Sequence, residues 1–231
     1  TIVMKFGGTS VATLEKIKKV AKTVKAESIN HKIVVVLSAM AGVTNELQSL
    51  INEIKFKASK EADLILTSGE QVTIGLLSML LKKEGIKSIP LLGWQIPIVT
   101  DDKHEKGRIL NINNENLNKY FLSNDVIVLA GFQGVSTHGF ITSLGRGGSD
   151  TTAVAIASSI KAERCDIYTD VEGVYTTDPN IEINAKKIDK LAYEEMLEMS
   201  STGAKVLQTR SVELAMKNNL TLQVLSSFTN Q

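Results

Sequence analysis

The sequence predicts an α/β fold, a three-layer αβα sandwich with a largely parallel central sheet. Short apolar runs alternate along the chain with segments whose apolar residues recur at helical spacing, and glycine turns follow several of the runs. Most predicted strands are continuously apolar, which is typical of parallel sheets covered on both faces. Together these observations predict helices on both sides of one sheet.

The N-terminal part of the chain repeats the pattern of strand, turn and helix. Ile2 to Phe6 is a predicted strand that ends at a glycine turn, and an amphipathic helix follows over residues 14–24. A second strand, residues 32–38, precedes a helix over residues 47–54. The residues from Thr67 to Glu70 resemble a capping box that opens a long apolar helix, which Gly85 ends.

The remaining strands are predicted at residues 87–92, 125–132, 165–171 and 220–227, and residues 140–143 as a small hairpin or flap. A helix from Thr151 to Ile160 has Ser149 and Asp150 in capping positions. The sequence contains no internal repeat, low-complexity stretch or obvious linker. The whole chain, residues 1–231, is therefore expected to form one domain whose sheet has two lobes.

Composition excludes several classes of protein. Lys plus Arg (26) balances Asp plus Glu (25), so the broad basic surface that nucleic-acid binding requires is not expected. Cys165 has no partner for a disulfide and is predicted to be a buried small residue, and His31, His104 and His138 lack metal-ligand spacing. With no signal peptide and no apolar run of about 18 residues, a soluble, cytoplasmic protein is expected.

Lys5 is the first candidate functional residue. It lies inside an apolar strand, where a charge is costly unless an anion meets it, although an edge lysine could instead extend to water. Gly7 and Gly8 follow directly, and their backbone N–H groups could bind an anion. The Walker A pattern of P-loop proteins is absent, so a nucleotide is not expected to bind in that manner.

The second candidate is the loop from Arg146 to Asp150, which precedes a predicted helix. An arginine fork matches a carboxylate or phosphate, glycines allow a ligand to approach the backbone, and a helix N-terminus attracts anions. An ordinary glycine loop with surface charges is the alternative. The carboxyl ends of parallel strands, where both glycine loops lie, are the usual binding edge of such sheets.

Two further segments are ambiguous on their own. Residues 168–179 could form a nucleotide pocket or a simple hairpin, and the hairpin is favoured for that segment taken alone. Ser38, Thr44 and Asn45 follow a strand, but each could equally cap the next helix. Glu70 already has a structural role as the last residue of the predicted capping box. The pattern around Met196 and Met199 is that of a helix core.

Four segments together resemble the aspartate kinase (aspartokinase) family of the amino acid kinase superfamily. They are KFGGTS at residues 5–10, GRGGSD at 145–150, YTDVEGVYTTDP at 168–179 and SSTGAKVLQTRSVELA at 200–215. The resemblance follows the chain order over almost its whole length. It implies an amino acid kinase catalytic domain over residues 1–231 without the C-terminal ACT regulatory domains of that family.

The resemblance also implies residue roles. Lys5 would meet the transferred phosphoryl group, Gly7 and Gly8 would bind ATP phosphates, and Asp150 would be the catalytic aspartate that orients the lysines. The implied substrate-side residues are Ser38, Thr44, Glu70, Phe132, Arg146, Gly147, Gly148 and Ser149. The implied nucleotide-side residues are Thr169, Asp170, Tyr175, Asp178 and Lys205. Asn180 departs from the pattern, because the family commonly has an arginine there.

The implied reaction is ATP-dependent phosphorylation of the side-chain carboxylate of L-aspartate to 4-phospho-L-aspartate, the first step of lysine, threonine and methionine biosynthesis. Mg²⁺ would arrive on the ATP phosphates, and the sequence names no protein ligand for it. The partners implied are L-aspartate and ATP, without nucleic acid or membrane, and with a homo-oligomer as a further possibility. A different kinase of the same fold, acting on acetylglutamate or glutamate, and a non-catalytic amino-acid or nucleotide sensor remain the alternatives.

Overall fold

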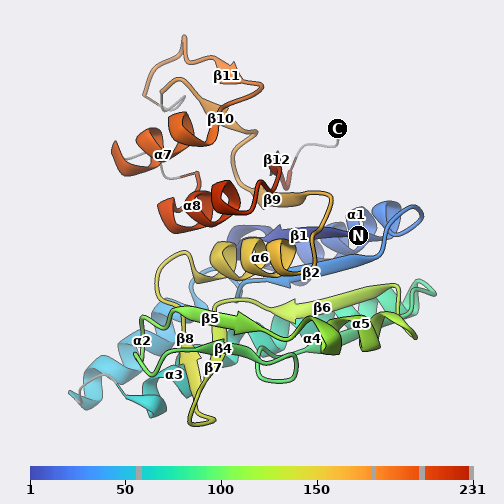
Figure 1. Ribbon diagram of the computed structural model, residues 1–231, viewed down its shortest axis with the longest axis vertical. Helices are drawn as coiled ribbons and strands as arrows, with labels where there is room; N and C mark the ends of the chain where they lie inside the picture. Colours follow the sequence, from blue (N-terminus) through green and yellow to red (C-terminus); the bar gives the residue numbers. More distant parts are fainter. Residues whose placement is uncertain (56–58, 178–180, 203–205, 229–231) are drawn as a thin grey trace.

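The computed structural model describes the chain except residues 56–58, 178–180, 203–205 and 229–231 (Figure 1). Its centre is a parallel six-stranded sheet in the order β12-β9-β1-β2-β6-β3. These strands are β1 (Ile2–Phe6), β2 (Ile33–Leu37), β3 (Ser88–Leu91), β6 (Val126–Ala130), β9 (Cys165–Thr169) and β12 (Leu222–Ser226). The predicted fold class and all six predicted strands of this sheet are confirmed.

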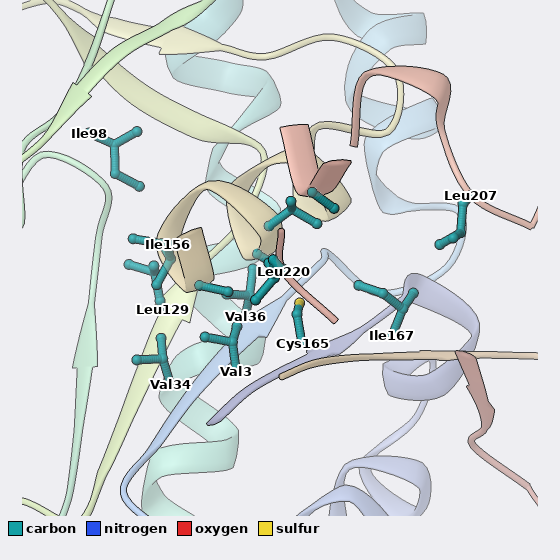
Figure 2. Close-up of a cluster of buried hydrophobic side chains, with 14 of the residues drawn as sticks. Val3, Val34, Val36, Ile98, Leu129, Ile156, Cys165, Ile167, Leu207 and Leu220 are labelled. Atoms are coloured by element: carbon teal, nitrogen blue, oxygen red, sulfur yellow. The ribbon is translucent and has the colours of Figure 1, made fainter. Parts of the chain in front are cut away.

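Helices cover both faces of the sheet because successive side chains of its strands point to opposite faces. On one face, Ile2 and Met4 pack with α1 (Leu14–Glu27) and α4 (Ser68–Lys83). On the other face, Val3 and Cys165 pack with α6 (Gly148–Ser159) and α8 (Thr209–Lys217). Figure 2 shows this second cluster, in which Val36 and Leu129 of the sheet lie near Ile156 of α6. The strands are apolar throughout because both faces are buried.

A smaller four-stranded sheet, in the order β5-β4-β7-β8, forms the second lobe. Its strands are β4 (Ile98–Thr100), β5 (Ile109–Ile112), β7 (Gln133–Ser136) and β8 (Ile141–Ser143). The predicted flap at residues 140–143 is confirmed as part of the antiparallel β7–β8 hairpin. The rest of this sheet was not predicted, because strands of three or four residues carry too little periodicity to be recognised.

The other elements flank these two sheets. They are the 3-10 helix η1 (Gly8–Val11), α2 (Val43–Ile54), α3 (Lys60–Leu66), α5 (Asn114–Phe121), the strand pair β10 (Val174–Tyr175) and β11 (Lys187–Ile188), and α7 (Tyr193–Thr202). In Figure 1, α2 and α3 lie at one end of the molecule, and α7, β10 and β11 lie at the other. Cys165 and Met196 are buried, as predicted.

The structure corrects the predicted capping of two helices. Thr67 occupies the N-cap position of α4, but its side chain makes no capping hydrogen bond: its hydroxyl donates to the Asp63 carbonyl at 2.8 Å, and α3 leads directly into α4. The capping box is therefore wrong, and the Glu70 carboxylate is available for another role. Helix α6 begins at Gly148 rather than Thr151, so Ser149 and Asp150 lie within its first turn instead of capping it.

Two further predictions concern α4, namely its end at Gly85 and the absence of a membrane-spanning segment. Gly85 ends the helix with a left-handed φ of +83°, as predicted. Within the described residues, the stretch Lys60–Lys83 is long and apolar enough in composition to cross a membrane, but half of its apolar window is buried inside the protein. Leu77 and Leu81 of this stretch pack beneath the central sheet, so α4 has the character of a core helix.

Candidate active site

One cavity gathers most of the predicted functional residues. It has a volume of about 320 Å³ and lies where β1, β2 and β6 end and where α4 and α6 begin. The predicted residues that line it are Lys5, Gly8, Ser38, Thr44, Glu70, Phe132 and Arg146 through Asp150. Strands from distant parts of the sequence end at this edge, and therefore the parallel sheet brings these side chains together.

Lys5 and Asp150 form an ion pair inside the cavity. Their Nζ and Oδ1 atoms are 2.6 Å apart, and each side chain is about nine-tenths buried. Lys5 comes from the end of β1, and Asp150 comes from the first turn of α6. The pair holds a lysine ammonium at a helix N-terminus, where backbone N–H groups already favour an anion.

The glycines next to Asp150 are required by close contacts. Gly147 has a φ of +69°, and a side chain there would collide with Gln208. A Cβ at Gly148 would lie 2.7 Å from the ring of Phe132. Phe132 itself has a φ of +67°, a conformation that is uncommon for a bulky residue and that places its ring in the cavity wall. A side chain at either glycine would therefore displace Gln208 or Phe132.

Arg146 extends from this loop with its side chain exposed to the open cavity. Its backbone is fixed from the opposite side, because one guanidinium nitrogen of Arg210 donates to the carbonyls of Leu144 at 2.9 Å and Arg146 at 3.0 Å. Among the ion pairs found in the described parts of the chain, none includes Arg146. A planar cation is thus presented to whatever anion enters.

Glu70 places a buried carboxylate on the opposite wall. Its side chain is almost fully buried, and Oε1 accepts a hydrogen bond from the Ala39 N–H at 3.1 Å. In the part of the chain that the structure describes, Oε2 has no hydrogen-bond partner. Burial raises the pKa of Glu70 to about 7, against the opposing hydrogen bonds from backbone N–H groups. A cationic ligand group at Oε2 would relieve that cost.

Of the described nucleotide-side residues, Gly7, Thr169, Asp170 and Tyr175 do not line this cavity. Gly7 follows β1, and its N–H approaches the Tyr168 carbonyl at 3.4 Å, so the turn after β1 meets the end of β9. Thr169 ends β9 and donates to Asp170 at 3.1 Å, and Tyr175 lies in β10. Asp178, Asn180 and Lys205 lie outside the described residues.

Other hollows of the molecule do not contain these residues. Two larger ones, of about 620 and 680 Å³, lie on either side of β12. Neither is lined by a predicted substrate-side residue, nor by Thr169, Asp170 or Tyr175. The described residues also contain no cluster of three or more His, Cys, Asp or Glu side chains arranged to hold a metal ion.

Sequence reasoning missed part of the cavity wall. Ala39 through Gly42, which follow β2, line it as well, and Gly42 has a φ of +91° at the start of α2. A short run of apolar residues ending in glycine after a strand was the available signal. Arg210 was also missed, because an arginine in the first turn of an amphipathic helix looks like any exposed cation.

The chain is similar to known proteins over most of its length. The model for the amino acid kinase family matches residues 1–226. The aspartokinase of Rickettsia felis is 51% identical, over 98% of this chain and 58% of its own length. Among solved structures, aspartate kinase from Synechocystis has a TM-score of 0.85 at 41% identity, covering 100% of this chain and 39% of that one.

Another solved structure is E. coli aspartokinase III in complex with aspartate and ADP. It has a TM-score of 0.85 at 28% identity, and the match covers 98% of this chain and 62% of that protein. In each of these matches the chain spans less than two thirds of the other protein's length.

Proposed function

Because this chain belongs to the amino acid kinase family, we propose that it transfers the γ-phosphoryl group of ATP to the side-chain carboxylate of L-aspartate, forming 4-phospho-L-aspartate and ADP. One observation carries the proposal: Arg146, Glu70 and the Lys5–Asp150 pair face a single cavity of about 320 Å³. Similarity to aspartokinases over nearly the whole chain supports the same choice of acceptor.

The acceptor side of the cavity suits an α-amino acid. Arg146 would bind the α-carboxylate through its guanidinium fork, and Glu70 Oε2 would receive the ammonium group. Ser38, Thr44 and Ser149 would add hydrogen bonds, and Phe132 would form the apolar wall. An acceptor held at both α-substituents has its side-chain carboxylate left free to react. The volume matches a small polar molecule.

The reaction needs positioning and charge more than proton transfer. An aspartate side-chain carboxylate is already ionised near pH 7, so no general base is required. One of its oxygens would form a bond to the γ-phosphorus while the bond from that phosphorus to the β–γ bridging oxygen breaks, and ADP leaves with the electron pair.

Lys5 would neutralise charge on the transferred phosphoryl group. Asp150, 2.6 Å from the ammonium, would hold Lys5 in place. The start of α6 and the glycine turn after β1 would present backbone N–H groups to the phosphates.

The nucleotide side of the proposal rests on the end of β9 and the segment beyond it. Gly7 and Gly8 would contact phosphates, and Thr169, Asp170 and Tyr175 would contact the nucleoside, together with Asp178 and Lys205. Mg²⁺ would enter on the triphosphate and neutralise its charge. Such a complex needs only one or two protein carboxylates.

The wider setting is proposed on the same basis. ATP and L-aspartate would be the partners, the cytoplasm the location, and the product the first intermediate of lysine, threonine and methionine biosynthesis. A homo-oligomer is compatible with this proposal.

A coupled assay of ADP release tests the function directly. The purified chain is given ATP and Mg²⁺ with L-aspartate, L-glutamate, N-acetylglutamate or carbamate, and hydroxylamine traps any acyl phosphate. Of the four acceptors, we expect only L-aspartate to give turnover and trapped product. Turnover with another acceptor would assign a different kinase of this fold, and binding of ATP or aspartate without any turnover would assign a sensor.

A further inference from the structure

A second acidic group lies behind the cavity wall and takes no part in the proposed chemistry. Asp63 of α3 is completely buried and does not line the cavity. Its Oδ1 accepts hydrogen bonds from the Ser143 hydroxyl at 2.6 Å and from the Glu105 N–H at 2.9 Å. Its Oδ2 contacts His104 Nδ1 at 2.6 Å. A buried carboxylate with this many partners joins three separate parts of the chain.

Those contacts fasten residues 104–107 to the end of β8. The Gly107 N–H donates to the Ser143 carbonyl at 2.8 Å, in addition to the contacts through Asp63. Glu105 has a φ of +61°, an uncommon conformation for this residue type that its hydrogen bond to Asp63 helps to maintain. Residues 104–107 thus have one fixed position against Ser143.

The fastened segment supports the start of the Arg146 loop. A Cβ on Gly145 would lie 3.0 Å from the Glu105 carbonyl oxygen, so the two backbones are in direct contact. Leu144 is fully buried, and its N–H donates to the Phe132 carbonyl at 2.9 Å. Only Gly145 separates this anchored residue from Arg146. A shift of residues 104–107 would therefore change where the Arg146 guanidinium points.

We propose that Asp63, with His104 and Ser143 as its partners, is a positioning residue for the acceptor. It fixes the backbone of residues 144–146 and so holds Arg146 at the angle that receives the acceptor carboxylate. The inference rests on the proposed function for the identity of that carboxylate. Because the described contacts of Asp63 include none with Gly7, Thr169, Asp170 or Tyr175, its loss acts on acceptor binding and leaves ATP binding unchanged.

The test compares Asp63→Asn with the wild-type chain in two measurements. Steady-state kinetics give KM for L-aspartate and ATP, and hydrogen exchange by mass spectrometry follows the amides of residues 144–148 without substrate. We expect KM for L-aspartate to rise about tenfold or more, since small misplacements of binding groups are costly. KM for ATP should change less than about twofold, and residues 144–148 should exchange faster.

Asp102→Asn is the matched control. Asp102 pairs with His138 at 2.9 Å in the same lobe, but it holds the tip of the β7–β8 hairpin, and both side chains are exposed. The control should leave both Michaelis constants and the exchange of residues 144–148 unchanged. If Asp63→Asn does not fold, Ser143→Ala decides instead, because it removes one hydrogen bond and leaves the charge balance intact.

Two results would overturn the inference. One is a folded Asp63 variant with wild-type exchange in residues 144–148. The other is an equal rise of both Michaelis constants together with a lower Tm, as a purely structural role predicts. If the proposed function itself were wrong, the wild-type chain would not phosphorylate L-aspartate, which distinguishes that outcome from the two above. The exchange measurement would still decide whether Asp63 fixes the loop.

Discussion

The proposed acceptor side and the proposed nucleotide side of the candidate site are built differently. On the acceptor side, Glu70 and Ser149 are buried in the first turns of two long helices that pack on the central sheet. On the nucleotide side, Asp170 is exposed and Tyr175 is half-buried in a strand of two residues. Buried groups held by several elements leave little room for adjustment, whereas exposed groups can readjust. Substitutions should therefore cost more on the acceptor side.

The largest expected effect is that of Lys5→Met. Losing the cation at the transferred phosphoryl group should lower kcat by about a hundredfold or more. The variant also leaves the buried Asp150 without its ion pair, so Tm is measured and activity is assayed well below it. Lys18→Met is the control, because Lys18 pairs only with Glu15 on the exposed surface of α1. Near-normal turnover of the Lys5 variant would refute the assignment.

Glu70→Gln should remove a pH dependence of stability. Burial raises the pKa of Glu70 from 4.5 to about 7. The contribution of protonated Glu70 to the free energy of unfolding is therefore fully present below pH 4.5 and is lost as pH rises through about 7. Wild-type Tm should fall by several degrees more than that of the variant between pH 5 and pH 8. Burial also raises the pKa of Asp166, to about 6. The fall in Tm that Asp166 causes is the same in both proteins, so it cancels in the comparison.

The same carboxylate should set the pH dependence of acceptor binding. An ammonium group requires ionised Glu70, so calorimetric titration should find L-aspartate binding tightening as pH rises from 6 to 8 in the wild type. Glu70→Gln should bind more weakly with little pH dependence. An unchanged pH profile in the variant would mean that Glu70 does not face the ammonium group.

Arg146→Lys should give a smaller, more selective effect. Lysine keeps the charge but loses the planar fork, so KM for L-aspartate should rise about tenfold while KM for ATP stays nearly constant. Arg108→Lys, on an exposed arginine of the same lobe that does not line the cavity, should change neither constant. A rise confined to KM for ATP would mean that Arg146 binds ATP rather than L-aspartate.

The smallest effect is expected for Tyr175→Ala on the nucleotide side. A half-buried aromatic contact contributes about 1 kcal/mol, so KM for ATP should rise by less than about tenfold and kcat should change little. Steady-state kinetics with ATP varied at saturating L-aspartate would measure it. A hundredfold loss here would mean that the nucleotide side is as tightly constrained as the acceptor side.

Much of the site could be predicted because its residues lie in short motifs at strand ends. Lys5, Gly8 and the residues from Arg146 to Asp150 were found in this way and line one cavity. Asp63 and His104 could not be found, because they are 41 residues apart and show no pattern until the fold brings them together. Glu70 was recognised, but its predicted capping role was wrong, because its carboxylate accepts from the Ala39 N–H instead of closing a capping box with Thr67.

The sequence by itself determined the parallel sheet, the helices around it and the glycine loops, because apolar periodicity and turn residues are local properties of the chain. The tertiary structure alone decided which loops share a cavity and which charges are paired there. The ion pair of Lys5 with Asp150 joins residues 145 positions apart, and the contacts of Asp63 join α3 to β8. Such contacts depend on strand order and burial, and a buried charge is stable only where distant parts of the chain supply its partners.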